Sequence, residues 1–208
     1  MKVQVKSEVL EIFPTPLVVV NYPYDYSDEL KWIQSCDYNV SVSGATRRTK
    51  DTFLLDRPQL TKVREFIEFM LSKYMNEIYG SSTKLRITQC WANRTSKGQN
   101  EPAHYHTNSM VSGVWYPKFS SDHPSICFHK EIINKSIEFV SKDNKFTSNS
   151  NYLTPEVGDI ILFPSNLTHS VEQNRSDEER ISLSFNTWLE GSMGSVSNLS
   201  YIPEEVRR

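Results

Sequence analysis

The stretch DIILFPSNLTHSVEQNRSDEERISLSFNTWLE, residues 159–190, carries the pattern that decides the fold. Short runs of β-favouring residues in it are separated by turns rich in Pro, Asn and Ser. In the last run, 180–190, polar and apolar side chains alternate. This alternation places Arg180 and Ser182 on one face of a strand and Ile181 on the other. The stretch therefore predicts consecutive short strands, the last of which has a polar face.

The same alternation extends upstream as far as residue 84. The predicted strands are 84–94, 103–106, 110–116, 125–129, 136–141, 159–163, 168–173 and 180–190. Many short strands separated by Gly, Pro, Asn and Ser turns are typical of a jelly-roll sandwich or barrel. The polar stretch 142–151 is expected to be a surface loop, and the Ser/Gly-rich tail 191–208 is expected to be loosely attached.

Before residue 80 the spacing becomes helical. Residues 27–36 start with Ser and Asp and predict a short helix. Residues 58–79 repeat apolar positions every three or four residues, with Pro58 suited to the first turn and Gly80 to the position after the end. The repeated side chains, expected to face the core, are Leu60, Val63, Phe66, Ile67, Met70, Leu71, Tyr74, Met75 and Ile78.

Length and composition indicate one globular domain. The 208 residues fit a single mainly β (α+β) domain, in which helical support at 27–80 flanks a jelly-roll core at 84–190. A formal net charge of −2 gives no basic surplus for binding duplex nucleic acid, and the same near-neutrality argues against a membrane role. Three widely spaced cysteines without a CxxC motif suggest reduced thiols in the cytoplasm, and no signal peptide is expected.

Three of the five histidines are candidates for metal ligands. His104 and His106 lie two apart, and residues i and i+2 of a strand face the same side, so both rings can converge on one ion. His169 follows the strand that ends in FPSNLTH. Neutral imidazole binds Fe, Zn, Cu and Ni. Because an HxH pair is common by chance, the third histidine is what makes a metal site credible. The remaining histidines, His123 and His129, lie outside the pattern and are expected to be structural.

Arg180 begins the polar face of the last strand. Burying a guanidinium is costly unless an anion meets it. A dicarboxylate such as 2-oxoglutarate is a natural partner, held by the arginine fork with a hydroxyl from Ser182. The alternative is an exposed arginine paired with Glu178 or Glu179.

Three runs carry a family resemblance: WANRTSKGQNEPAHYHTNSMVSGVWY (91–116), VGDIILFPSNLTHSVEQN (157–174) and ERISLSFN (179–186). Together they resemble the 2-oxoglutarate/Fe(II) oxygenase family of marine bacteria and their phages. The resemblance covers the carboxyl-terminal two-thirds of the chain. It implies a double-stranded β-helix (cupin-like), with Fe(II), 2-oxoglutarate and O₂ as cofactor and co-substrates. The implied reaction couples 2-oxoglutarate decarboxylation to hydroxylation of a substrate.

The sequence departs from the wider superfamily at one ligand position. The usual first motif is HxD, whereas His106 stands where the carboxylate would be. Either His104, His106 and His169 form a neutral triad, or only one histidine of the HxH pair ligates and water or another carboxylate completes the shell. By the resemblance, an inward Tyr116 or Asn93 helps to hold 2-oxoglutarate or substrate. Both, like Trp91, can instead be core residues.

Two rival functions remain open. A cupin-like three-histidine metalloenzyme that does not use 2-oxoglutarate would not need Arg180, and a non-catalytic jelly-roll binding module would hold no metal. The primary substrate, whether a small molecule or a protein side chain, is not specified by the sequence, and neither is the oligomeric state. The expected location is the cytoplasm of a bacterium or of a phage-infected host cell.

Overall fold

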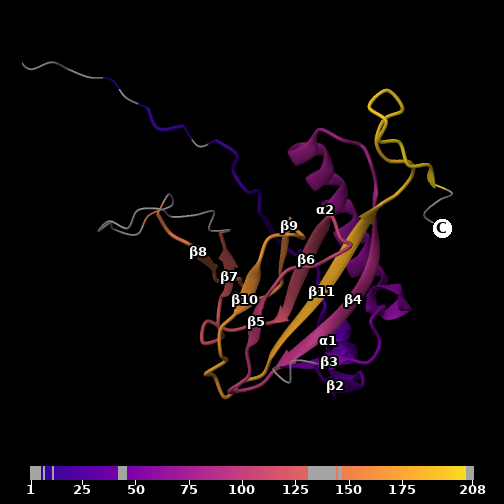
Figure 1. Cartoon of the computed structure of the whole chain (residues 1–208). Coiled ribbons are helices and arrows are strands. Elements are labelled where there is room, and N and C mark those ends of the chain that lie inside the picture. The colour runs from indigo at the N-terminus through magenta and orange to yellow at the C-terminus, as the bar shows by residue number, and fades with distance from the viewer. Residues whose placement is uncertain are drawn as a thin grey trace, which may run out of the picture.

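The computed structural model describes residues 6, 8–10, 12–41, 46–130, 144 and 147–204. Its α-helices are α1 (Ser27–Ser35) and α2 (Thr61–Tyr79), with short 3-10 turns at Leu54–Asp56 and Pro58–Leu60. Its strands are β1 (Val18–Asn21), β2 (Tyr38–Val40), β3 (Arg47–Thr49), β4 (Leu85–Thr95), β5 (Glu101–His104), β6 (Val111–Lys118), β7 (Ile126–His129), β8 (Ser150–Leu153), β9 (Asp159–Pro164), β10 (His169–Val171) and β11 (Arg180–Leu189) (Figure 1).

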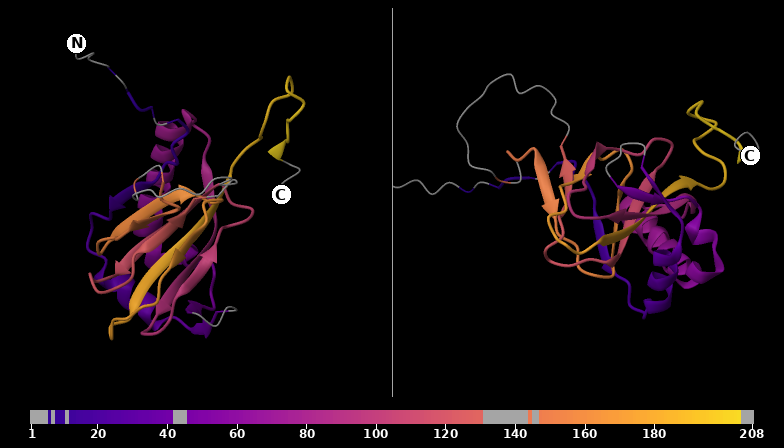
Figure 2. Two further views of the ribbon diagram at one scale, coloured as in Figure 1. Left: turned by 60° about the vertical axis from the view of Figure 1, so that its left-hand side comes forward. Right: turned by 90° about the horizontal axis from the view of Figure 1, so that it is seen from below.

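The strands form two antiparallel sheets. The larger sheet has the order β1-β9-β6-β11-β4-β3-β2, and the smaller sheet has the order β5-β10-β7-β8. The helices lie on one side of the larger sheet and the smaller sheet lies on its other side, which gives three layers (Figure 2). The mainly β architecture with amino-terminal helices is confirmed.

The larger sheet has an apolar face and a polar face because its strands alternate. On β11, Ile181, Leu183 and Phe185 are fully buried in the core that includes α2. The intervening Ser182 and Ser184 face the smaller sheet and line a pocket. The predicted alternation on this strand therefore separates the packing side of the sheet from the pocket side.

Helix α2 ends where the sequence predicts but begins three residues later than predicted, at Thr61. Pro58 opens the 3-10 turn that leads into the helix. Gly80 closes it at φ +60°, with its N–H bonded to the carbonyl of Asn76, and the left-handed conformation explains the need for glycine. The predicted stripe is buried along most of its length, but Ile78 in the last turn is 40% exposed, so its assignment to the core is wrong.

Four strands were not predicted. β1, β2 and β3 each span three or four residues, too few to show a period. The fourth, β8, starts at Ser150, inside the stretch expected to be a loop, and pairs with β7. The predicted strand 136–141 lies outside the described residues. In the tail, Met193 and Ile202 exchange two backbone hydrogen bonds.

Neither α-helix in the described part of the chain is long and apolar enough to span a membrane.

Gly113 on β6 permits a close approach between two strands. It lies directly opposite Phe185 of β11, and a Cβ at position 113 would overlap the fully buried Phe185 ring. We therefore expect Gly113→Ala to lower the free energy of unfolding by about 1–3 kcal/mol, as overpacking does. Urea denaturation measures the change. The double variant Gly113→Ala, Phe185→Leu should recover part of it, and an unchanged single variant would contradict the steric explanation.

Candidate metal centre and adjoining pocket

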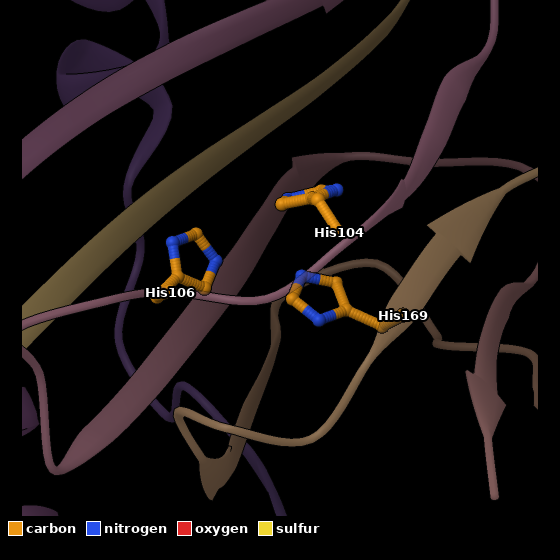
Figure 3. A group of neighbouring side chains, drawn as sticks. All are labelled: His104, His106 and His169. Atoms are coloured by element: carbon orange, nitrogen blue, oxygen red, sulfur yellow. The ribbon is translucent and has the colours of Figure 1, made fainter. Parts of the chain in front are cut away.

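Three histidine rings meet between the two sheets. His104 is the last residue of β5 and His169 is the first residue of β10, and the two are direct partners across these antiparallel strands. His106 follows two residues after β5. One ligand atom from each ring lies within 4.8 Å of the other two (Figure 3). The structure thus brings together all three histidines that the sequence singled out.

The reason for the convergence of His104 and His106 differs from the predicted one. The strand was expected to run through residue 106, but β5 ends at His104. The backbone N–H of His106 instead bonds to the carbonyl of Ser165 at 2.9 Å, which anchors the following loop. Tyr105 between the two histidines is 58% exposed and points away from the site.

Backbone contacts fix the tautomers of two ligand candidates. The Nδ1 of His104 lies 2.8 Å from the carbonyl of Pro102, and the Nδ1 of His169 lies 2.9 Å from the carbonyl of Leu167. A carbonyl can only accept, so each Nδ1 carries the proton and each Nε2 presents a lone pair. This is the arrangement in which supporting groups usually hold a metal-binding imidazole.

The site favours uncharged imidazoles. Burial, followed by the neighbouring charges of His169, His104 and Arg48, lowers the pKa of His106 to about 3. Burial also lowers the pKa of His169 to about 4, although its bond to the Leu167 carbonyl opposes the shift. Neutral imidazole is the form that binds metal. Three neutral nitrogen donors, with no carboxylate in the cluster among the residues described, suit a divalent transition metal such as Fe(II).

A pocket adjoins the histidines, between the polar face of the larger sheet and the smaller sheet. It encloses about 450 Å³ of empty space, part of which is open to solvent. The side chains at its centre are His104 and His169 from the smaller sheet and Asn93, Tyr116, Arg180, Ser182 and Ser184 from the larger one. All four residues predicted to bind a co-substrate, Asn93, Tyr116, Arg180 and Ser182, therefore line this pocket.

Arg180 is buried, with 4% of its surface exposed. Its guanidinium carbon lies 5.0 Å from the centre of the Tyr116 ring and 5.9 Å from that of Phe119. No ion pair to Arg180 is found within the described ranges, and Glu179 pairs with Arg94 instead, at 3.0 Å. Burial lowers the pKa of Arg180, whereas Tyr116 and Glu101 oppose the shift. The guanidinium thus faces inward without a protein carboxylate, so the surface-pair alternative is wrong.

Several polar atoms of the pocket lack partners. Among the described residues these include the Nε of Arg180, the hydroxyl of Tyr116 and the Oδ1 of Asn93. The Nδ2 of Asn93 donates to the Oγ of Ser184 at 3.1 Å. Buried polar groups are normally satisfied, and two of these atoms, the Nε of Arg180 and the hydroxyl of Tyr116, can donate, so they indicate a ligand that accepts hydrogen bonds. A carboxylate fits this requirement.

The sequence analysis missed Glu101, which also lines the pocket. A register shift in β5 places Glu101 opposite Val171 and His104 opposite His169, so one strand residue is extra. Because of this bulge, Glu101 and His104 contact the same pocket although they are three positions apart. Pro102 in the middle of the strand was the available signal, since proline inside a strand marks an edge or a bulge.

The other two histidines lie outside the metal cluster. His129 contacts the Oγ of Ser170 through its Nε2 at 2.8 Å. The Nδ1 of His123 accepts the backbone N–H of Ser120 at 3.0 Å, and its Nε2 donates to the carbonyl of Glu178 at 3.1 Å. Both rings therefore have structural partners.

His123 should make folding stability depend on pH. Burial lowers its pKa, and the charges of Arg180 and Lys118 act in the same direction, whereas the Glu178 carbonyl and carboxylate oppose it. The unfolded chain therefore takes up a proton as the pH falls below 6.5, while the folded chain does so only at lower pH. Stability should thus be lost from pH 6.5 downward.

The test compares the metal-free protein with its metal-free His123→Gln variant, which keeps an acceptor and a donor but has no titrating ring. Urea unfolding between pH 5 and 7.5 should show a steeper loss of stability for the unaltered protein. Parallel curves would contradict this role of His123.

Comparisons with known proteins agree on the fold. Residues 89–186 match the family model described as "Putative 2OG-Fe(II) oxygenase". No curated protein matches the chain in sequence. Solved structures do match: the α-ketoglutarate-dependent epimerase SnoN from nogalamycin biosynthesis is 13% identical, covers 86% of this chain and 80% of its own, and gives a TM-score of 0.63.

Two further structures are similar to a comparable extent. HygX from Streptomyces hygroscopicus, solved with nickel, 2-oxoglutarate and hygromycin B, is 13% identical, with 83% of this chain and 82% of that chain covered and a TM-score of 0.59. A prolyl-4-hydroxylase from Pseudomonas putida is 12% identical, with 85% and 94% covered and a TM-score of 0.57. These likenesses show that the two facing sheets form a double-stranded β-helix, as predicted.

Proposed function

We propose that this chain is a 2OG-Fe(II) oxygenase, as the family match over residues 89–186 supports, in which His104, His106 and His169 hold the iron and Arg180 anchors 2-oxoglutarate. The observation that carries the proposal is the placement of a neutral three-histidine cluster beside a buried guanidinium without an acidic partner among the described residues. When bound, Fe(II) supplies the oxidising chemistry, in which O₂ converts 2-oxoglutarate to succinate and CO₂ and hydroxylates a substrate C–H bond.

The residues of the chain bind and orient in this reaction. The Nδ1 atoms of His104 and His169 are held by backbone carbonyls, so their Nε2 atoms are the ones that can ligate. The fork of Arg180 provides paired donors for a carboxylate, and Ser182 and Tyr116 add hydroxyl donors in the same pocket. Asn93 presents an amide on the adjacent strand β4.

Aromatic side chains shield part of the pocket from water. The rings of Tyr116 and Phe163, both buried, form part of its wall. A dry site strengthens the attraction between Arg180 and a carboxylate. No side chain is needed as a nucleophile or as a general acid in this scheme.

The proposed substrate class and cellular location follow from the net charge and from the cysteines. We infer a small molecule or a protein side chain as substrate, and no duplex nucleic acid, because the net charge is −2. The three cysteines are free, which supports a location in the cytoplasm of a bacterium or of a phage-infected cell.

Metal analysis combined with 2-oxoglutarate binding and turnover tests the function. The purified protein should bind about one Fe(II) per chain under anaerobic conditions and should bind 2-oxoglutarate only when metal is present. On exposure to O₂ it should form succinate. Metal binding without 2-oxoglutarate binding would favour a cupin-like enzyme of other chemistry, and binding of neither would favour a non-catalytic module.

A further inference from the structure

An ion pair bridges the two sheets beside the histidine cluster. The Nη2 of Arg48 on β3 lies 2.7 Å from the Oε1 of Glu101 on β5, and the Oγ1 of Thr46 donates to the Oε2 of the same carboxylate at 3.0 Å. Glu101 lines the pocket together with His104. The proposed function assigns no role to this pair.

Arg48 belongs to the polar face of the larger sheet. It is the direct partner of Asn93 on β4, and Asn93 lines the pocket. Trp91, two residues before Asn93 on the same face, is the diagonal neighbour of Arg48, a separation that long side chains can span. The Trp91 ring lies 5.9 Å from the His106 ring, and Arg48 pairs with Glu101, which lines the pocket together with His104. Arg48 and Trp91 thus flank the metal cluster on the side of His106.

Hydrogen-bond donors are in excess at this position. Both carboxylate oxygens of Glu101 already accept bonds, from Arg48 and from Thr46. By contrast, the Nε of Arg48 and the Nε1 of Trp91 are buried and have no acceptor among the described residues. A group that accepts hydrogen bonds would complete both.

The charge balance favours a negative group. Histidines that bind a metal are uncharged, so the charges of bound Fe(II) and 2-oxoglutarate would cancel, and Arg48 and Glu101 cancel each other. Arg180 then leaves one positive charge, which an aspartate in the place of His106 would have neutralised. An anionic substrate would restore neutrality.

We propose that Arg48 and Trp91 form the subsite for a carboxylate of the primary substrate. This inference rests on the proposed function, because it assumes that 2-oxoglutarate occupies Arg180. Glu101, which lines the pocket, holds the Arg48 guanidinium in an ion pair when substrate is absent. Recognition of a cationic substrate by Glu101 is disfavoured, because both of its carboxylate oxygens already accept hydrogen bonds.

Calorimetry on protein loaded with Ni(II), which does not turn over, and saturated with 2-oxoglutarate tests the subsite. The probes are the twenty proteinogenic L-amino acids and a series of aliphatic and aromatic monocarboxylates, each matched with its carboxamide. We expect at least one acid to bind about tenfold or more tightly than its amide, the contribution of a charge-assisted hydrogen bond.

Four variants then assign the preference to Arg48. Arg48→Gln should abolish the advantage of the acid over its amide, and Arg48→Lys should keep part of it, because lysine retains the charge but not the fork. Glu101→Gln should keep or increase it, since a competing anion is removed. Arg47→Gln is the matched control, because Arg47 is exposed and on the other face of β3.

Three results would overturn the proposal: no acid in the panel binds better than its amide, Arg48→Gln keeps the preference, or Glu101→Gln loses binding of an amine-bearing probe. Each can occur in protein that still binds Ni(II) and 2-oxoglutarate. The outcome is therefore separable from a failure of the proposed function, in which metal or 2-oxoglutarate does not bind at all.

Discussion

The variant His169→Ala is expected to bind no Fe(II) or Ni(II) at concentrations that saturate the unaltered protein. His169 supplies the only ligand candidate from β10 and lies within 4.8 Å of the two others, as measured between ligand atoms. Its removal leaves two nitrogen donors on one short segment, 104–106. The loss of affinity should exceed the roughly 10–100-fold that follows from removing a supporting partner of a ligand.

Metal stoichiometry after dialysis and calorimetric titration with Ni(II) both measure this effect. His129→Ala is the matched control, because His129 lies on the neighbouring strand β7 and contacts Ser170 rather than the cluster. The control should retain one equivalent. If His169→Ala also retained one equivalent, the ligand set proposed here would be wrong.

Replacement of Arg180 by methionine, which keeps much of its volume, is expected to weaken 2-oxoglutarate binding by about 1.5–3 kcal/mol, or roughly 10- to 150-fold. The guanidinium is buried and has no acidic partner among the described residues, so a co-substrate carboxylate is its expected counter-ion. Metal affinity should not change, because Arg180 is not part of the histidine cluster.

Folding stability gives an independent readout for Arg180→Met. A buried guanidinium without a partner disfavours folding, so the ligand-free variant should be as stable as the unaltered protein or more stable. Arg175→Ala, at an exposed position, is the control and should bind 2-oxoglutarate normally. An unchanged affinity in Arg180→Met would favour an enzyme that does not use 2-oxoglutarate.

Long periodic segments were the predictable part of the fold. Nine residues of one helical stripe, closed by Gly80, specified α2 because each position adds the same signal. The alternation in β11 fixed the direction of Arg180 and Ser182 in the same way. The strands β1–β3 escaped prediction because three or four residues are too few to show a period, and the partners of β1 and β3, which are β9 and β4, are distant in sequence.

In the candidate site, too, some residues could be predicted from the sequence and others could not. His104, His106 and His169 could be selected because their side-chain chemistry is specific, although β5 is bulged and ends at His104. Glu101 could not, because a bulge in β5 turns it toward the pocket against the simple alternation. Arg48 was equally hidden, since its role depends on pairing between β3 and β4 that no local pattern records.

The position of His104 and His169 directly across from each other on β5 and β10 has a mechanical consequence. β5 is an edge strand of four residues, attached to its sheet on one side alone within the described structure. An ion bound by both rings would add a reversible cross-link between β5 and β10. Metal binding would then stabilise the pairing of β5 with β10, and metal loss would weaken it. The strand that presents His104 would thus be held in place by the ion that His104 binds.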